Sequence, residues 1–402
     1  MLDPELIGSI GCLVVHLGVC LYLYFREPHF YLGSVYVLAM LGFYFLPSVV
    51  NHWVYADFRL HLPVELTWLA GSLAVLGIRH ADGYRVPVRG PARLGSRAYT
   101  QLVLAVIVAA AALLFGRGAA YVPWRVLLFG SYLISIWVGL VAYRRRAVRL
   151  YRWALGAALL CVGVFAFGVW TGHGRLHLTR YVLGLFVLTT LICPPQPTHR
   201  LKMAVLLLLP VGLGLLGGLR SLPTAGSTHT YGLASILHPT RYTQRLYVDM
   251  ETDRFAAQNG RSYLVALLAL YPRRWWPTKP DGFGRTLFLW YVNDDSGTMS
   301  SLAGSYVGES LGNFRRLGLW IAPLVLGGFV LFIRELSRDG QLMMLESHER
   351  LLLQVLPVLV LPDLLWGGLF TATSRLMLTV LGLAVLLTTL RVGSRLCRQA
   401  FV

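Results

Sequence analysis

Long runs of apolar residues, broken by short polar segments, follow one another along most of the chain. An α-helix needs about 20 apolar residues to cross the hydrocarbon core of a membrane, and such runs favour membrane spans over the periodic stripes of a soluble core. The pattern predicts an all-α polytopic membrane protein with eleven spans. They cover residues 7–25, 29–50, 62–78, 99–115, 124–143, 153–170, 178–193, 203–219, 317–333, 351–369 and 376–390.

The gap between the eighth and ninth spans is long enough to form an extramembrane element. We divide the chain into a transmembrane bundle of eight spans at 1–219, a large loop at 220–316 and three further spans at 317–402. The loop is expected to carry amphipathic or interfacial helices. Composition agrees with a membrane protein, because 56% of the residues are hydrophobic and only 13% are charged.

The basic residues orient these spans. Lysine and arginine together outnumber the acidic residues by 36 to 18, and nearly all of them are arginine. One set of alternate connections holds 19 of them, whereas the opposite short connections hold six. The six are Arg59, Arg117, Arg125, Arg175, Arg180 and Arg375. Cytoplasmic loops are the enriched set, so we expect the N-terminus and the 220–316 loop outside and the C-terminus inside.

The 220–316 loop carries eleven basic residues, against this bias. Long loops translocate largely regardless of charge, so one interpretation is a solvated basic loop. The other is a cationic cup for an anionic group at the membrane surface. Nucleic acid is excluded as a partner, because this face lies outside the cell and no nucleic-acid-binding fold is recognisable.

Metal and disulfide chemistry is not indicated. The five cysteines form no CxxC pair. His173 and His177 stand at i,i+4 spacing but lack a nearby acidic partner. We therefore expect no metal and no cofactor.

Residues 239–259 of the loop are predicted to form a helix, with Pro239 in its first turn and Gly260 at its end. The candidate anion ligands here are four arginines, whose planar guanidinium groups match phosphate oxygens. They are Arg241, Arg245, Arg254 and Arg261. Arg245 has an alternative as the i,i+4 ion-pair partner of Asp249. Arg261 opens the apolar run "RSYLVALLAL", which is too short to span a membrane and fits an interfacial or re-entrant helix.

The stretch "YPRRWWPTKPDG" follows directly. Its prolines favour an extended path, and Trp275 and Trp276 are typical interfacial anchors. This path would hold Arg273, Arg274 and Lys279 close to lipid phosphates.

Two titratable residues of the loop are candidate catalytic groups. Glu309 precedes the ninth span and has three interpretations: a general base, an acceptor for a sugar hydroxyl, or the ion-pair partner of an arginine. His238 is the second candidate base.

Ionisable residues also lie near the ends of spans. Asp363 and Arg375 are expected on the same outer side, where they either neutralise each other or bind a ligand. Glu65 is similar, whereas His16, in the middle of a span, is interpreted as a hydrogen-bonded packing residue.

Two segments of the loop resemble the Wzy-type polymerases of bacterial polysaccharide repeat units. The segments are "GRSYLVALLALYPRRWWPTKPDGFG" and "SSLAGSYVGESLGNFRRLGLWIAPLVLGG". Gly260–Tyr263, Pro272–Pro280 and Gly308–Gly318, which includes Asn313, match the family pattern. Arg315 departs from it, because the family usually has glycine there.

The resemblance implies a GT-C-like glycosyltransferase in the bacterial inner membrane, related to the O-antigen ligases. Such an enzyme transfers a growing glycan from undecaprenyl diphosphate onto an incoming lipid-linked repeat unit at the outer face. It needs no nucleotide sugar, and its partners would be the lipid-linked oligosaccharide, membrane lipids and a chain-length regulator protein. The resemblance makes 220–316 the catalytic loop and adds Asn313 to the substrate-binding candidates.

Other functions remain open at this point. An O-antigen ligase shares the carrier and differs only in transferring the glycan to lipid A core. A flippase or transporter would also have many spans, but it should show internal repeats and polar residues at the membrane midplane. A membrane protein without enzymatic activity is the remaining alternative.

Overall fold

The computed structural model describes most of the chain, and every regular element in the described part is a helix. The described residues are 4–27, 31–55, 58–81, 97–115, 121–169, 176–192, 200–208, 234–269, 271, 274–292, 302–336 and 347–400. Eight helical stretches among them are long and apolar enough to cross a membrane. This confirms the all-α polytopic class, but it does not confirm the number of eleven spans.

The helices of the first half are α1 (Pro4–Arg26), α2 (Leu32–Met40), the π-helical turn η1 (Leu41–Phe45), α3 (Leu46–Val54), α4 (Leu62–Ala81), α5 (Arg97–Phe115), α6 (Tyr121–Arg144), α7 (Val148–Gly163), the π-helical turn η3 (Val164–Val169) and α8 (Leu176–Ile192). The predicted eighth span, 203–219, lies mostly outside the described residues. Its described part belongs to the helical stretch 200–208. The helices of the second half are α10 (Ala234–Glu251), α11 (Arg261–Leu267), α12 (Phe283–Val292), α13 (Ser305–Phe314), the 3₁₀ turn η4 (Arg315–Leu317), α14 (Gly318–Leu336) and α15 (Ser347–Ala400).

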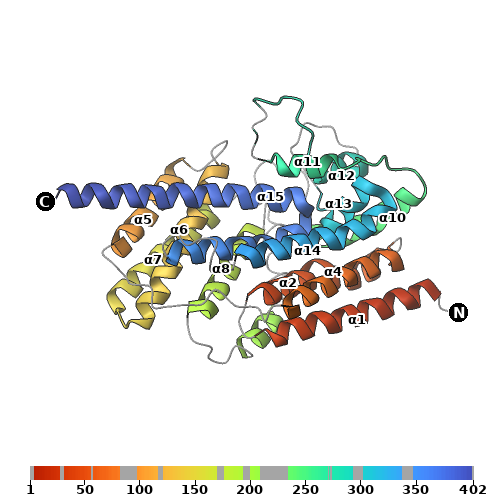
Figure 1. Ribbon diagram of the computed structural model, residues 1–402, viewed down its shortest axis with the longest axis horizontal. Coiled ribbons are helices and arrows are strands. Elements are labelled where there is room, and N and C mark those ends of the chain that lie inside the picture. The colour runs from red at the N-terminus through yellow and green to blue at the C-terminus, as the bar shows by residue number, and fades with distance from the viewer. Residues whose placement is uncertain are drawn as a thin grey trace.

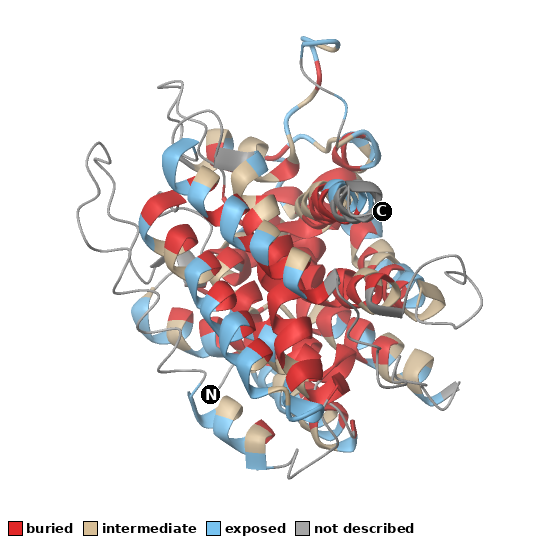
Figure 2. Cartoon of the chain, turned by 90° about the vertical axis from the view of Figure 1, so that its left-hand side faces the viewer, coloured by how far each residue is buried: buried red, intermediate tan, exposed pale blue. Residues whose placement is uncertain are grey.

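The outward surfaces of the long helices are apolar. Phe167 is 91% exposed and Trp320 is 77% exposed. Figure 2 shows that buried residues gather in the centre of the bundle, while exposed residues lie on the outward faces of its helices. Apolar surface of this extent is typical of lipid contact, which agrees with a membrane protein.

Helix α15 contains two arms that run in opposite directions. Glu349 and Arg391 form an ion pair although 42 residues separate them. A straight helix would place residues this far apart at a distance of about 60 Å. The reversal occurs at Gly368, whose φ of 82° and ψ of −174° are not helical. The two arms therefore correspond to the predicted spans 351–369 and 376–390.

Figure 1 shows that the short helices α10–α13 gather at the end of the molecule where α1 begins, and the C-terminus lies at the opposite end. The Gly368 turn belongs to the same end as these short helices, because Thr373 donates a hydrogen bond to the carbonyl oxygen of Ala266 in α11 (3.1 Å). The fold thus brings the segment that contains α10–α13, here called the central loop segment, against the turn of α15.

The helix predicted at 239–259 differs from α10 at both ends. Helix α10 begins at Ala234, so Pro239 lies inside it, and it ends at Glu251. Gly260 does not end this helix but precedes α11, with a φ of 79° that glycine adopts without steric cost. The prediction that a short apolar helix starts at Arg261 is correct.

Two of the span residues singled out in the sequence are buried and hydrogen-bonded. The Nε2 atom of His16 lies 2.5 Å from the hydroxyl of Ser72, which agrees with a packing role. Glu65 accepts hydrogen bonds from Tyr44 and from the side-chain amide of Gln244. Glu65 therefore connects α4 to α10 and is occupied by structural contacts.

Replacing Gly368 with alanine should destabilise the turn, because the new Cβ would collide with the Glu309 carboxylate and the backbone would keep a positive φ. We expect a loss of about 2–4 kcal/mol in the free energy of unfolding, measured by denaturation in detergent. Gly328→Ala in α14 is the matched control, since its Cβ would meet no atom within 4 Å. Equal stability of both variants would contradict the role of this turn.

Candidate functional site

Glu309 lies at a junction of three helices. Its side chain is fully buried in α13. One carboxylate oxygen accepts a hydrogen bond from the Ser262 hydroxyl of α11 (2.7 Å), and the other accepts one from the backbone N–H of Leu369 in α15. This arrangement, the Glu309 junction, joins the central loop segment to the C-terminal helices.

The turn at Gly368 explains why α15 has a donor to offer. The first N–H groups of a helix have no partner within that helix, and the positive end of its dipole favours an anion. The second arm of α15 begins directly after Gly368, so the N–H of Leu369 points out of that helix end. The buried carboxylate of Glu309 satisfies it.

Asn313 and Ser262 reinforce the same junction. The Asn313 amide donates to the Ser262 hydroxyl (2.7 Å) and to the carbonyl oxygen of Glu309 (2.7 Å), and its oxygen accepts from the Ser262 N–H (3.3 Å). The hydroxyls of Tyr263 and Ser310 lie 2.6 Å apart. The segments 260–263 and 308–313, which carry the resemblance, are therefore in direct contact.

These contacts bear on the three interpretations of Glu309. No arginine of the described residues pairs with it, so the ion-pair interpretation has no support. Both oxygens already accept hydrogen bonds and the side chain has no exposed surface. A role as a base or as a hydroxyl acceptor therefore requires α11 or the Gly368 turn to move aside.

The arginines of α10 lie over aromatic rings. The guanidinium carbon of Arg241 is 3.7 Å from the ring centre of Tyr55, and that of Arg245 is 4.8 Å from the ring centre of Tyr291. Asp249 accepts a hydrogen bond from the Tyr291 hydroxyl (2.7 Å) instead of pairing with Arg245, so the i,i+4 ion pair is not formed. Burial raises the pKa of Tyr291, and its hydrogen bond to Asp249 adds to this increase.

Three further predicted anion ligands are exposed arginines, as Arg245 is. Arg254 follows α10, Arg261 begins α11, and Arg274 lies in the stretch rich in tryptophan and proline. Arg261 is adjacent in sequence to Ser262 and so lies beside the Glu309 junction. Arg273 lies outside the described residues, and its role stays a prediction.

Lys279 is buried and its ammonium group is occupied. It donates hydrogen bonds to the carbonyl oxygens of Leu268 (2.9 Å), Ala269 (3.0 Å) and Tyr271 (3.0 Å). The last carbonyl groups of a helix lack partners within it, so this cation stabilises the chain where it leaves α11. A phosphate contact by Lys279 stays a prediction, but these bonds favour a structural role.

His238 does not contribute one of the hydrogen bonds described for the Glu309 junction. It is 8% exposed in α10 and packs edge-to-face on Tyr242, with 5.2 Å between the ring centres. The contacts of the Glu309 junction come from α11, α13 and α15. His238 as a base stays a prediction.

Asp363 and Arg375 form the ion pair that sequence analysis considered, and Arg180 joins it from α8. Asp363 is fully buried in the first arm of α15, and Arg375 belongs to the second arm. Both flank the Gly368 turn. The pair therefore connects the two arms of α15 to each other and to α8.

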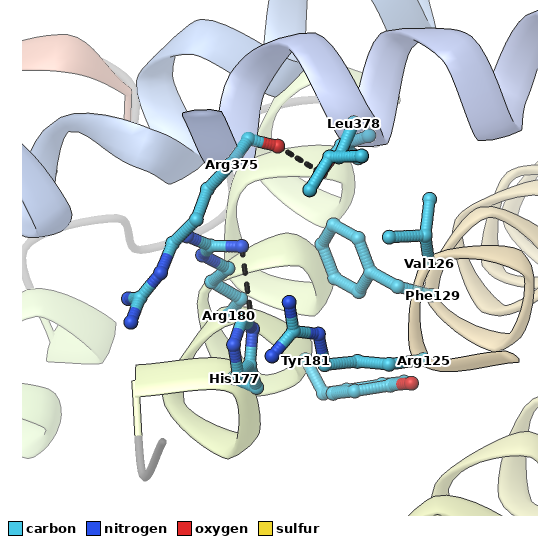
Figure 3. Close-up of a pocket in the computed structure, with 9 residues that line it drawn as sticks. Arg125, Val126, Phe129, His177, Arg180, Tyr181, Arg375 and Leu378 are labelled. Carbon is cyan, nitrogen blue, oxygen red and sulfur yellow. Dashed lines mark hydrogen bonds between the residues drawn. The ribbon is translucent and has the colours of Figure 1, made fainter. Parts of the chain in front are cut away.

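A small pocket adjoins this ion pair. Figure 3 shows Arg125, Val126 and Phe129 entering it from α6, His177, Arg180 and Tyr181 from α8, and Arg375 and Leu378 from α15. We call it the arginine pocket. The Nδ1 atom of His177 lies 3.4 Å from a guanidinium nitrogen of Arg180. The second histidine of the predicted i,i+4 pair, His173, lies outside the described residues.

Arg125 and Arg180 were not among the site residues predicted from the sequence. One feature of the sequence could have pointed to them. Together with Arg375, they belong to the six arginines in the short connections that hold few basic residues. Residues 83–248 contain no aspartate or glutamate, so a carboxylate for these arginines has to come from elsewhere in the chain. Asp363 supplies it for Arg180, and only the tertiary fold reveals that pairing.

Comparisons with protein-family models, with curated proteins and with solved structures give no match. The resemblance to the Wzy-type polymerases therefore stays a prediction that rests on the motif residues.

Arg315, where the chain departs from that motif, takes a backbone conformation with a φ of 54° and a ψ of −137°. Glycine adopts this region readily, whereas other residues pay a cost in free energy. The Arg315 side chain pairs with Asp253 (2.6 Å), and both partners are largely exposed. Next to it, Arg316 binds Glu251 and holds the pKa of that carboxyl group below its usual range.

Arg315→Gly should relieve this strain. We expect the free energy of unfolding to rise by about 1 kcal/mol, since an exposed ion pair contributes little. Asp253→Asn is the control, because it removes the same ion pair and leaves the strained residue in place. If thermal denaturation shows the glycine variant to be less stable than this control, the strain argument fails.

Lys279→Met should loosen the chain after α11, because three carbonyl groups lose their charged donor. A loss of about 2–3 kcal/mol and faster limited proteolysis near residues 268–280 are expected. Arg274→Met, at an exposed position in the same segment, should leave both unchanged. Unchanged stability combined with weaker substrate binding in the Lys279 variant would instead favour the phosphate contact.

Proposed function

We propose that this protein is a lipid-diphosphate-dependent glycosyltransferase that polymerises undecaprenyl-diphosphate-linked oligosaccharide repeat units at the outer face of the bacterial plasma membrane. The observation that carries the proposal is the contact between the two segments that resemble the polymerases. Ser262 and Glu309, 47 residues apart, bond to each other beside the exposed Arg261. A motif whose separate parts meet in space is more informative than the same residues scattered over a surface.

The chemistry matches the residues available. Breaking the bond at the anomeric carbon places negative charge on the departing lipid diphosphate. Guanidinium groups that bind this charge more tightly in the transition state lower the barrier. Arg254 and Arg261 are exposed in the segment that would face the membrane surface. Diphosphate is a good leaving group, so it needs no protonation.

The acceptor hydroxyl loses a proton in this reaction, and a positioned base typically contributes 10²- to 10⁴-fold. Glu309 and His238 are the candidates. Since Glu309 is buried, we infer that the incoming sugar reaches it only after α11 or the Gly368 turn shifts. In the closed state Glu309 positions Ser262 and Asn313.

A single assay tests the function. Purified protein is incubated with a lipid-linked repeat unit, and the products are separated by size. A ladder of products is expected. Transfer only to lipid A core would replace the proposal with an O-antigen ligase, and lipid movement across a bilayer without transfer would replace it with a flippase.

Alanine substitution of Arg241, Arg254 or Arg261 should lower polymer formation by roughly 10²-fold or more while the protein remains folded in the membrane. Arg149→Ala, at an exposed position on α7, is the control and should make polymer normally. Wild-type chain lengths in all three loop variants would exclude the diphosphate role of these arginines. Near-normal turnover of Glu309→Gln would exclude a general-base role for Glu309.

A further inference from the structure

Three arginines line the arginine pocket: Arg125, Arg180 and Arg375. Guanidinium groups reach it from α6, α8 and α15, and the carboxylate bonded there is that of Asp363, which binds both Arg180 and Arg375. Like charges this close repel one another, and they do so more strongly in a buried site than in water. Such a site is complementary to an anion.

Some buried polar atoms of residues that line the pocket are left without a hydrogen bond, and two of them belong to His177 and Arg180. Within the described residues, the Nε2 atom of His177 and the Nε atom of Arg180 have no partner. The two residues are 5% and 4% exposed. Buried polar atoms are usually satisfied, and one that is not calls for an explanation such as a ligand. Both residues line the pocket, as Figure 3 shows.

We propose that the arginine pocket binds a phosphate-type anion, either a phosphate or a diphosphate group. Guanidinium groups bind phosphate oxygens through paired N–H donors, and a histidine supplies a further donor. As it stands, the pocket has room for about one water molecule. The anion therefore enters as Arg375, whose side chain is 18% exposed, moves outward. It then competes with Asp363 for the same arginines.

The proposed function supplies a source for this anion. A polymerase holds two lipid diphosphates at once, one on the growing glycan and one on the incoming repeat unit. The exposed arginines of the central loop segment and the arginine pocket would be two separate binding regions for them. Gly368 lies five residues after Asp363 and seven before Arg375, so the same turn borders the pocket and the Glu309 junction. The lipid source rests on the proposed function, whereas the anion class does not.

The two members of the ion pair give opposite predictions. Binding of inorganic pyrophosphate to the full chain in detergent is measured by calorimetry. Arg180→Gln should weaken binding at least tenfold, because the anion loses one guanidinium group that would bind it. Asp363→Asn should strengthen it at least tenfold, because a competing carboxylate is removed. A purely structural ion pair would not produce opposite shifts. Arg149→Gln, at an exposed position on α7, is the control and should retain pocket binding.

Folding of each variant is checked by thermal denaturation and gel filtration. If Arg180→Gln or Asp363→Asn fails to fold, Arg375→Gln at the rim replaces it and should also weaken binding. Absence of pyrophosphate and phosphate binding to the wild type, or equal affinity in all pocket variants, overturns the proposal.

A second binding experiment uses a short-chain prenyl diphosphate as the probe. Competition between this lipid and pyrophosphate for the pocket supports the carrier lipid as the source. Pyrophosphate binding that the lipid does not displace keeps the anion site and excludes the lipid source. If the wild type binds pyrophosphate but forms no polymer from lipid-linked repeat units, the proposed function is wrong and the anion site stands.

Discussion

The hydrogen bond from the Leu369 N–H to the Glu309 carboxylate is the contact on which the rest of the arrangement depends. A backbone group left unsatisfied within the apolar part of a membrane protein costs several kcal/mol. Helix α15 cannot reverse at Gly368 without exposing such groups at the start of its second arm. Glu309 satisfies one of them, and the same carboxylate holds Ser262 of α11. One side chain thus decides where α11, α13 and α15 meet.

Basic residues outnumber acidic residues in this protein, and the buried carboxylates bind side chains from other helices. Asp363 holds arginines from α8 and from the second arm of α15, whereas Glu65 holds a tyrosine and a glutamine. A buried carboxylate without partners would be strongly unfavourable, so each of these acids specifies which helices lie next to it. Within the described residues, the arginine pocket is lined by three arginines, and Asp363 is bonded to two of them, Arg180 and Arg375.

The basic residues of the central loop segment do not form one class. Lys279 is buried and bonded to carbonyl groups, the half-buried Arg241 and the exposed Arg245 lie over aromatic rings, and Arg254 and Arg261 are also exposed. A phosphate approaching from outside meets the exposed arginines first. This ordering follows from burial, since a cation already paired with protein groups has less to gain from a new anion.

The sequence alone determined that this is a helical membrane protein, because apolar runs of membrane-spanning length leave few alternatives. It also placed Asp363 near Arg375 and predicted the start of α11 at Arg261. It misplaced the ends of α10, because a proline and a glycine mark helix ends only on average and the packing of α10 favoured a different range. The reversal at Gly368, the burial of Lys279 and Glu309, and the meeting of Arg125, Arg180 and Arg375 were decided by the tertiary structure. These features depend on contacts between residues far apart in the chain, and no local pattern of hydrophobicity or charge specifies which distant partner satisfies a buried polar group.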